Sequence, residues 1–492
     1  MAKRTTIIDI GSNSITLVIY EKSSRYGFFL IEKSRSRVRI GENAYESGGK
    51  LSDEAMDKAF HTLVDFKQIA LAYKCKKIFC VATSALRDAP NKKDFILRVR
   101  RELKLNIKVI DGEKEAYFGA LAGANLLPPI DEATTIDIGG GSTELAKIKD
   151  GKIVDTISLD IGTVRLKELF FDQKAGIEEA KKYIDTILKK LPENFYSSKI
   201  IGIGGTIRAL SSAIMKKESY PIDNLHAFTY EYDIHQNFIK EVSTSTVLGL
   251  KDMPISSSRY DTIREGSTIF SRICDFIGAK EIITSKAGVR EGVYLHDILR
   301  SSHGKFPQNF NVSIKSLQDR FALLPRHSSH TQRVCKRIYN VLYDEFDNDK
   351  IYAEELFKAA KLLHIVKRLN IYSNSDQSFF FLLENLNFSL SHEEKLLIAI
   401  LLRFSQKGKI DKKKYKRYKE LLPSYEVLEW LVFVLCATEA LTRNKSLNPI
   451  ECQYDQKVLA IKSNEDLFLA KEAIKKIYKP KAFAIEIEKV GT

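Results

Sequence analysis

The sequence lacks paired cysteines. Six cysteines occur among its 492 residues, and no two of them form a CxxC motif. This spacing excludes a zinc knuckle and a dithiol redox site, while scattered thiols favour a reducing compartment. We therefore expect a cytoplasmic protein. The six are Cys75, Cys80, Cys274, Cys335, Cys436 and Cys452.

Long hydrophobic runs are also missing. The most apolar stretches, 396–402 and 430–437, are far shorter than the roughly 20 residues that a membrane-spanning helix needs. We predict buried helices there and no membrane partner. The apolar run near the N-terminus is interrupted at Asp9, which predicts a strand rather than a signal peptide. No long segment has the compositional bias of a disordered region.

The chain carries an excess of basic residues. The net charge is +15, from 78 Lys and Arg against 63 Asp and Glu. An excess of this size favours an acidic partner, either nucleic acid, an anionic membrane or a polyanionic substrate. A generally lysine-rich composition explains it equally well. The length predicts about three domains.

An internal repeat is the first strong feature. Residues 6–17 read TIIDIGSNSITL and residues 134–145 read TTIDIGGGSTEL, with Asp9 aligned on Asp137. In each copy an apolar β-branched run ends in Asp, a turn of Gly, Ser or Asn follows, and an alternating strand resumes. This order of residue types predicts a β-hairpin. Two such copies, each followed by helices, predict two similar α/β lobes.

Composition and breaks in the pattern predict four parts. Pro128-Pro129 separates the lobes, and the polar, turn-rich segment 301–307 is the best boundary candidate. After it, residues 315–445 have an almost continuous helical pattern. The predicted domains are residues 1–128 (lobe I), 129–302 (lobe II), 303–445 (helical) and 446–492 (a small α/β tail).

The two glycine turns are suited to binding an anion. Consecutive N–H groups in a tight turn form a concave anion site, and glycine lets a phosphate approach the backbone closely. An ordinary hairpin turn is the alternative for either copy alone. The predicted phosphate-binding residues of the turns are Gly11, Ser12, Asn13, Ser14, Gly139, Gly140, Gly141, Ser142 and Thr143.

Acidic residues accompany the turns. Asp9 and Asp137 end apolar strands, where a carboxylate is costly unless it is used. Either side chain could simply cap its turn. The functional interpretation is coordination of Mg²⁺, with Mn²⁺ as a substitute, beside bound phosphates. Asp137 is the stronger metal candidate, and Glu144 could join the two aspartates.

The arrangement resembles the superfamily of actin, heat-shock ATPases and sugar kinases. The lobes of that superfamily carry DxG-type phosphate loops, and a third glycine turn opens a helix in the second lobe. The segment 200–210, reading IIGIGGTIRAL, fits that third turn. The resemblance adds Gly204, Gly205 and Thr206 to the predicted phosphate-binding residues.

Three further motifs narrow the resemblance. ATSALRDAPN (82–91), DGEKEAYFG (111–119) and AGVREGVY (287–294), together with DIGSNS and DIGGGSTEL, resemble the exopolyphosphatase / guanosine pentaphosphate phosphohydrolase (Ppx/GppA) family. The likeness runs through about the first 300 residues. It implies two actin-like lobes with a cleft between them. It also implies release of the terminal phosphate of inorganic polyphosphate, or of pppGpp to give ppGpp.

The same resemblance implies roles for single residues. Glu115 becomes the catalytic base, and Asp137, the metal candidate from the second turn, is the other residue that we predict to be catalytic. Arg87 and Arg259 become phosphate contacts, and the planar guanidinium fork suits that task. Without the family resemblance, we would interpret Glu115 as a solvated glutamate at the start of a helix. Arg290 and Glu291 are interpreted as a packed pair near the lobe interface. The family also favours a homodimer, and the need for a monovalent cation stays open.

The C-terminal region resembles a degenerate HD phosphohydrolase domain. His330 matches the first metal ligand, but His364 is followed by Ile365 instead of Asp, and Ser405 stands near an expected His. We therefore expect no metal and no catalysis there. The region should extend the binding channel or form a dimer interface.

Two other functions remain open at this point. An ATP-dependent kinase or ATPase of the same superfamily shares the phosphate loops, and the ATSALRDA and EKEA motifs argue against it. A non-enzymatic (p)ppGpp- or RNA-binding regulator would use the basic surface, and its binding would weaken steeply with salt. We expect no stable complex with nucleic acid.

Overall fold

The computed structural model describes residues 3–173, 176–347, 349–369, 375–405 and 408–490. The chain divides into two compact units, Met1–Phe310 and Asn311–Thr492. This division falls just after the polar segment 301–307. The finer division into four domains remains a prediction.

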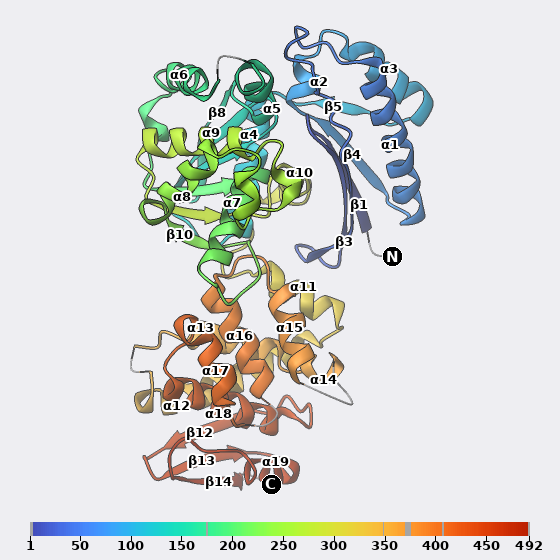
Figure 1. Ribbon diagram of the computed structural model, residues 1–492. Coiled ribbons are helices and arrows are strands. Elements are labelled where there is room, and N and C mark those ends of the chain that lie inside the picture. Colours follow the sequence, from blue (N-terminus) through green and yellow to red (C-terminus); the bar gives the residue numbers. More distant parts are fainter. Residues whose placement is uncertain (1–2, 174–175, 348, 370–374, 406–407, 491–492) are drawn as a thin grey trace. The chain divides into compact units, whose positions relative to one another are not determined.

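A five-stranded sheet forms the first lobe of the first unit, in the order β3-β2-β1-β4-β5. β1, β2 and β3 are antiparallel neighbours, while β4 pairs parallel with β1 and with β5. Helices α1 (Asp53–Ala72) and α3 (Lys92–Leu103) bury apolar side chains in one core with this sheet (Figure 1). The strands are β1 (Lys3–Ile10), β2 (Ile15–Lys22), β3 (Phe28–Ser36), β4 (Lys77–Ala82) and β5 (Ile107–Val109).

The second lobe repeats this plan. Its six-stranded sheet has the order β10-β11-β9-β6-β7-β8. Strands β8, β7 and β6 form an antiparallel meander, as β3, β2 and β1 do in the first lobe. Strands β9 and β11 then pair in parallel, and β10 adds an antiparallel strand at the edge. The repeat predicted from the sequence is therefore present as two similar α/β lobes. The strands are β6 (Glu132–Ile138), β7 (Thr143–Lys149), β8 (Lys152–Leu159), β9 (Lys199–Ile203), β10 (Thr229–Glu231) and β11 (Glu281–Thr284).

A large apolar core fills the second lobe. Four long helices contribute most of its buried residues, and the six strands of the sheet contribute others. The helices are α6 (Gly176–Leu188), α7 (Gly204–Lys217), α8 (Tyr232–Thr244) and α9 (Ile263–Ile277). The short elements of the first unit are α2 (Ser84–Asp88), α5 (Thr163–Leu166), the π-helix η1 (Lys167–Phe171), and 3₁₀ turns at Glu193–Phe195, Gly249–Asp252, Ser257–Arg259 and Arg300–Ser302.

Two helices pack closely beside the second sheet. α4 (Gly112–Leu126) lies against β7 and β8, and α10 (Val289–Ile298) lies against α4. A Cβ on Gly292 of α10 would come within 1.9 Å of the carbonyl oxygen of Phe118, so only glycine fits this contact. The Ala- and Gly-rich composition of α4 predicts such close packing. The packing fixes the N-terminal turn of α4, which carries Glu115.

The second unit is mainly helical and ends in a small sheet. The sheet has the order β12-β13-β14. The sequence also predicts strands at 457–461 and 482–489 with a helix between them, and the structure has all three, whereas β12 was not expected. The elements are α11 (Val312–Arg320), α12 (Pro325–Leu342), α13 (Ala353–Leu362), α14 (Ile365–Leu369), α15 (Ser375–Asn385), α16 (His392–Phe404), α17 (Lys412–Tyr418), α18 (Tyr425–Thr442), α19 (Phe468–Ile474), β12 (Ile450–Tyr454), β13 (Val458–Ser463) and β14 (Ala484–Lys489), with 3₁₀ turns at Tyr343–Glu345 and Lys419–Leu421.

The two apolar stretches predicted as buried helices lie in α16 and α18, and their side chains are buried. Among the described residues, no single helix has the length and hydrophobicity of a membrane span. One pair of helices, Lys412–Leu421 and Tyr425–Thr442, meets those criteria only when joined across a bend of 109°.

One buried acid in the second lobe carries a folding cost. Glu265 on α9 is 3% exposed, and its Oε2 has no hydrogen-bond partner among the described residues. Burial raises the pKa of Glu265 from 4.5 to about 7. The folded state prefers the protonated form of Glu265. The contribution of this protonation to the free energy of unfolding is therefore complete below about pH 4.5. It is lost as the pH rises through about 7.

We predict that Glu265→Gln removes this pH dependence. At pH 8 the variant should be more stable than the parent by up to about 3 kcal/mol, and at pH 4.5 the two should be nearly equal. Urea denaturation followed by far-UV circular dichroism measures the difference, because the single tryptophan, Trp430, lies in the other unit. The exposed Glu193→Gln is the control. Equal stability of Glu265→Gln and the parent at pH 8 would contradict the prediction.

Candidate functional site: an anion cleft between two glycine turns

The two glycine turns of the repeat meet in space. Each turn is closed by a backbone hydrogen bond, from Gly11 N to Ser14 O at 3.1 Å and from Gly139 N to Ser142 O at 2.9 Å. A Cβ placed on Gly140 would lie 2.8 Å from the Cβ of Ser12. The turns therefore touch, one from each lobe.

A cavity of about 500 Å³ opens beside this contact. Both turns, the third glycine turn and Glu115 contribute to its wall. Of the predicted site residues, those that line the cavity are Asp9, Gly11, Ser12, Asn13, Ser14, Glu115, Asp137, Gly139, Gly140, Gly204, Gly205, Thr206 and Arg259. Arg87, Gly141, Ser142, Thr143 and Glu144 lie outside the lining.

The third glycine turn lies against one of the acids. Gly204 has a φ of +92°, and a Cβ there would approach Asp137 Oδ1 to 2.7 Å. Glycine is needed here both for the backbone conformation and for space. The Gly204 carbonyl also accepts a hydrogen bond from Arg208 Nε at 2.7 Å. β6, β9 and α7 are thus joined at the carboxylate of Asp137.

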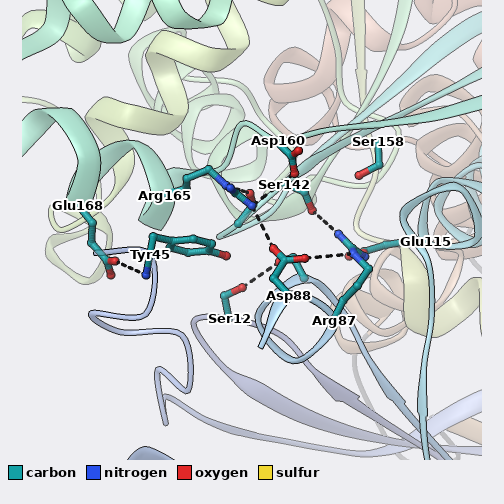
Figure 2. A network of polar contacts seen from close by, with 12 residues as sticks. Ser12, Tyr45, Arg87, Asp88, Glu115, Ser142, Ser158, Asp160, Arg165 and Glu168 are labelled. Atoms are coloured by element: carbon teal, nitrogen blue, oxygen red, sulfur yellow. Dashed lines mark hydrogen bonds and ion pairs between the residues drawn. The ribbon is translucent and has the colours of Figure 1, made fainter. Parts of the chain in front are cut away.

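Glu115 is 9% exposed and has an arginine partner (Figure 2). It stands in the first turn of α4, whose N-cap, Asp111, accepts from Lys114 N. Arg87, at the end of α2, donates to Glu115 Oε2 at 3.0 Å and to Ser142 Oγ at 3.1 Å. Its guanidinium lies 4.0 Å from Glu144 Oε1. Arg87 therefore ties the base candidate to the second glycine turn.

The acids around the cavity are buried beside one another, and this raises their pKa values. Burial raises the pKa of Asp137 to about 6 and that of Glu144 to about 7. The pKa of Glu115 is raised well above its usual value, by burial first and then by the charge of Glu144. The pKa of Asp9 is raised by burial, although Arg290 acts against it. A cation near these groups would lower all four pKa values.

The predicted metal ligands are not drawn together as one cluster. Asp9 accepts from Arg290 at 3.2 Å, and Glu144 accepts from Ser158 Oγ at 2.9 Å. Within the described residues, no three His, Cys, Asp or Glu side chains form a ready metal-binding group. Asp9 and Asp137 nevertheless face one cavity, and oxygen donors of this kind suit Mg²⁺, which keeps several of its waters when bound. The donor set fits a hydrated divalent ion.

Basic side chains line the rest of the cavity. Apart from Arg259, no sequence motif identifies them as phosphate-binding residues. Burial and neighbouring arginines lower the pKa values of Arg35 and Arg259, and bring that of Arg208 to about 10. Such mutual repulsion is relieved by a bound anion. The basic residues of the lining are Lys33, Arg35, Arg208, Lys216, Arg259, Lys286 and Arg290.

α10 also connects the lobes. Arg290 pairs with Asp9 of β1, and Glu291 accepts from Tyr20 Oη at 2.5 Å. Tyr294 stacks on Tyr20 with ring centroids 4.6 Å apart. The pair read from the REG motif therefore holds the first sheet against the second lobe.

In the second unit, His364 is hydrogen-bonded to a histidine that the sequence analysis did not single out. His327 and His364 lie 2.8 Å apart, Nε2 to Nε2. His330 is 4% exposed, and burial lowers its pKa.

The fold and the cleft define a two-lobed α/β protein with a basic cavity beside its paired glycine turns. The model of the Ppx/GppA phosphatase family matches residues 18–301, and the chain belongs to this family.

Curated relatives carry three different names. A bifunctional 3-dehydroquinate synthase/phosphatase of Fusobacterium nucleatum is 33% identical over 312 residues, covering 59% of this chain and 46% of the relative. Exopolyphosphatase 1 of Mycobacterium tuberculosis is 30% identical over 200 residues, covering 39% and 56%. A guanosine-5'-triphosphate,3'-diphosphate pyrophosphatase of Pseudoalteromonas atlantica is 26% identical over 371 residues, covering 73% and 70%. The chain thus spans only about half the length of the first two relatives.

Solved structures share the fold. A Ppx/GppA family member of Aquifex aeolicus has a TM-score of 0.53 and 28% identity, covering 62% of this chain and 100% of its own. An exopolyphosphatase of Cytophaga hutchinsonii has a TM-score of 0.56 and 24% identity, covering 60% and 98%. The second comparison supports the fold alone.

We predict that Gly205→Ala weakens anion binding through Arg259. The new Cβ would lie 2.6 Å from Arg259 Nη1 and force the guanidinium away. Calorimetric titration with inorganic tripolyphosphate in EDTA should show affinity at least ~10-fold lower, as for Arg259→Ala, because a charge-assisted contact is lost. Gly249→Ala is the matched control, since its Cβ meets only ordinary contacts at 3.5 Å. Parental affinity in Gly205→Ala would be contrary to this account.

Proposed function

We propose that the protein is a hydrolase of phosphoanhydride bonds that removes the terminal phosphate of inorganic polyphosphate, of pppGpp, or of both. The observation that carries this proposal is the shared cavity, where two glycine turns, Glu115 and a cation-rich wall meet. Substrates of both kinds end in a phosphoryl group on an anhydride chain. The names of the relatives agree with both substrates.

The residues take separate roles in this proposal. The backbone N–H groups and hydroxyls of both turns bind the terminal phosphoryl group, while Arg259 and the other basic residues of the wall bind the following phosphates. Glu115 orients a water molecule and accepts its proton as the water oxygen attacks phosphorus. A pKa above the ordinary glutamate range makes Glu115 a stronger base near neutral pH. Arg87 keeps Glu115 oriented.

Asp137 and Asp9 would hold Mg²⁺ or Mn²⁺, with Glu144 behind them. When bound, the ion would offset negative charge on the phosphate oxygens. The protein's own part is to bury these carboxylates at one cavity, where a divalent ion would stabilise their ionised forms against the rise in pKa that burial causes.

The HD-like relationship of the helical region, 303–445, is retained as a proposal. The hydrogen bond between His327 and His364 occupies the Nε2 atoms of both rings. That pairing favours a structural role for His364 over a catalytic one. We place catalysis in the first unit.

Glu115→Gln tests the base. The amide keeps the shape of the side chain but cannot accept a proton, so kcat for phosphate release should fall by about 10²–10⁴-fold. Affinity for tripolyphosphate should change little. Phosphate released from polyphosphate with Mg²⁺ and no acceptor is the assay, and it also separates a hydrolase from a kinase. Glu113→Gln, exposed on the same helical turn, is the control. A near-parental kcat in Glu115→Gln would rule out Glu115 as the base.

Asp137→Asn tests the metal site. Loss of the carboxylate should raise the Mg²⁺ concentration for half-maximal activity at least ~10-fold, because a neutral amide binds the cation more weakly. Titration of phosphate release against Mg²⁺ measures the shift, with the exposed Asp131→Asn as the matched control. If the Mg²⁺ dependence of Asp137→Asn matches that of the parent, Asp137 is not a ligand.

A further inference from the structure

A tyrosine side chain packs against the point where the two glycine turns meet. Tyr45 belongs to the loop between β3 and α1. A Cβ on Gly141 would lie 1.7 Å from Tyr45 Oη and 2.7 Å from Ser84 Oγ, so the phenol rests directly on the second turn. Burial raises the pKa of Tyr45, and the Ser12 and Ser84 hydroxyls act against that rise. The hydroxyl is therefore enclosed by residues of both phosphate loops (Figure 2).

Arg165 of the second lobe covers the ring of Tyr45. Its guanidinium carbon lies 4.5 Å from the ring centroid. Its Nε donates to the Gly141 carbonyl at 2.7 Å, and Nη2 pairs with Asp88 at 3.0 Å and with Asp160 at 3.4 Å. Every donor group named here has an acceptor, which fixes the stacked arrangement. Tyr45 and Arg165 thus form one packed layer with a residue from each lobe.

The loop that carries Tyr45 is fastened to the second lobe. Glu168 of η1 is 6% exposed and accepts from Asn43 N at 2.8 Å and from Tyr45 N at 3.0 Å. Gln173 donates to Glu46 at 2.7 Å. These contacts hold the loop across the lobe junction, so the position of the phenol is set by both lobes.

The layer stands at one end of the cavity. Ser12, Ser84 and Gly140 line the cavity, whereas Tyr45 and Arg165 lie behind them and outside the lining. Beyond the layer is solvent, since the Asp160 side chain that pairs with Arg165 is 76% exposed. The partition between the phosphate loops and solvent is therefore thin.

Charge differs on the two sides of the layer. On the cavity side, basic side chains extend from Lys33 and Arg35 to Arg259 and Lys216. On the outer side, Arg165 is paired with the carboxylates of Asp88 and Asp160. A polyanion is attracted along the cavity, whereas the guanidinium on the outer side is already paired with carboxylates.

We propose that Tyr45 and Arg165 form an end wall that stops a phosphate chain at its last unit, so that only a terminal phosphoryl group reaches Glu115. This inference rests on the proposed hydrolase function and adds to it the residues that restrict cleavage to chain ends. Tyr45 and Arg165 determine specificity through their bulk, and neither of them takes the proton from water.

The reaction is the same for terminal and internal bonds. The water oxygen bonds to phosphorus, the bond from that phosphorus to the bridging oxygen breaks, and one water proton passes to Glu115. The bridging oxygen leaves on the remaining chain as a phosphate oxygen. An internal phosphorus carries chain on both sides, and the wall leaves no room for the second arm.

A polyphosphate blocked at both ends tests the wall. Both terminal phosphates are converted to phosphoramidates of a bulky amine, and the products are separated by length on a gel. The parent should release phosphate from the free chain and leave the blocked chain intact. Tyr45→Ala and Arg165→Ala should cut the blocked chain into intermediate lengths, at least ~10-fold faster than the parent does. Tyr45→Phe keeps the ring and should leave the blocked chain resistant.

The outcomes separate the end wall from the proposed hydrolase function. If both alanine variants fold, release phosphate from the free chain and leave the blocked chain intact, the wall is excluded while the hydrolase proposal stands. If the parent releases no phosphate from the free chain with Mg²⁺, the proposed function and the wall both fail. Arg165 lies outside the β3–α1 loop, so Arg165→Ala provides the test should Tyr45→Ala fail to fold.

Discussion

The contact between the two glycine turns is the constraint on which the rest of the site depends. Gly140 can approach Ser12 only because it has no side chain, and any Cβ there would push the lobes apart at their junction. Residues from both lobes then reinforce the contact, with Arg290 on Asp9, Glu168 on the β3–α1 loop and Arg165 on Tyr45. Each of these pairs joins segments more than 100 residues apart. The cavity exists because two separate sheets are held at a fixed distance.

The electrostatics of the cleft follow from that distance. Asp9, Asp137, Glu115 and Glu144 come from different strands and a helix, yet burial raises the pKa of each. The basic side chains opposite them repel one another in turn. Burying several like charges together is costly, and the pairs Arg290–Asp9 and Arg87–Glu115 offset only part of that cost. A polyanion bound together with a divalent cation, as proposed, would neutralise the acidic and the basic groups at once.

Local patterns in the sequence predict the framework well. Short contiguous segments determine the hairpins around Asp9 and Asp137. The same holds for the third turn at Gly204 and for the helix that starts before Glu115. Strand β12 escapes prediction because it is short and mostly polar on its exposed side. Contacts between distant segments escape for a different reason. Nothing near Arg290 in the sequence indicates Asp9, and nothing near Tyr45 indicates Arg165. A period-two signal did exist in β3, where Lys33 and Arg35 point the same way into the cavity.

The most direct test of the account is a crystal structure of Glu115→Gln with tripolyphosphate and Mg²⁺. The account predicts one terminal phosphoryl group bound by backbone amides of both turns, residues 11–14 and 139–142, about 3–3.5 Å from a water held by the side chain at position 115. An anion bound to one turn only, or a residue 115 side chain directed away from it, would contradict the central claim that the two lobes form a single phosphate site.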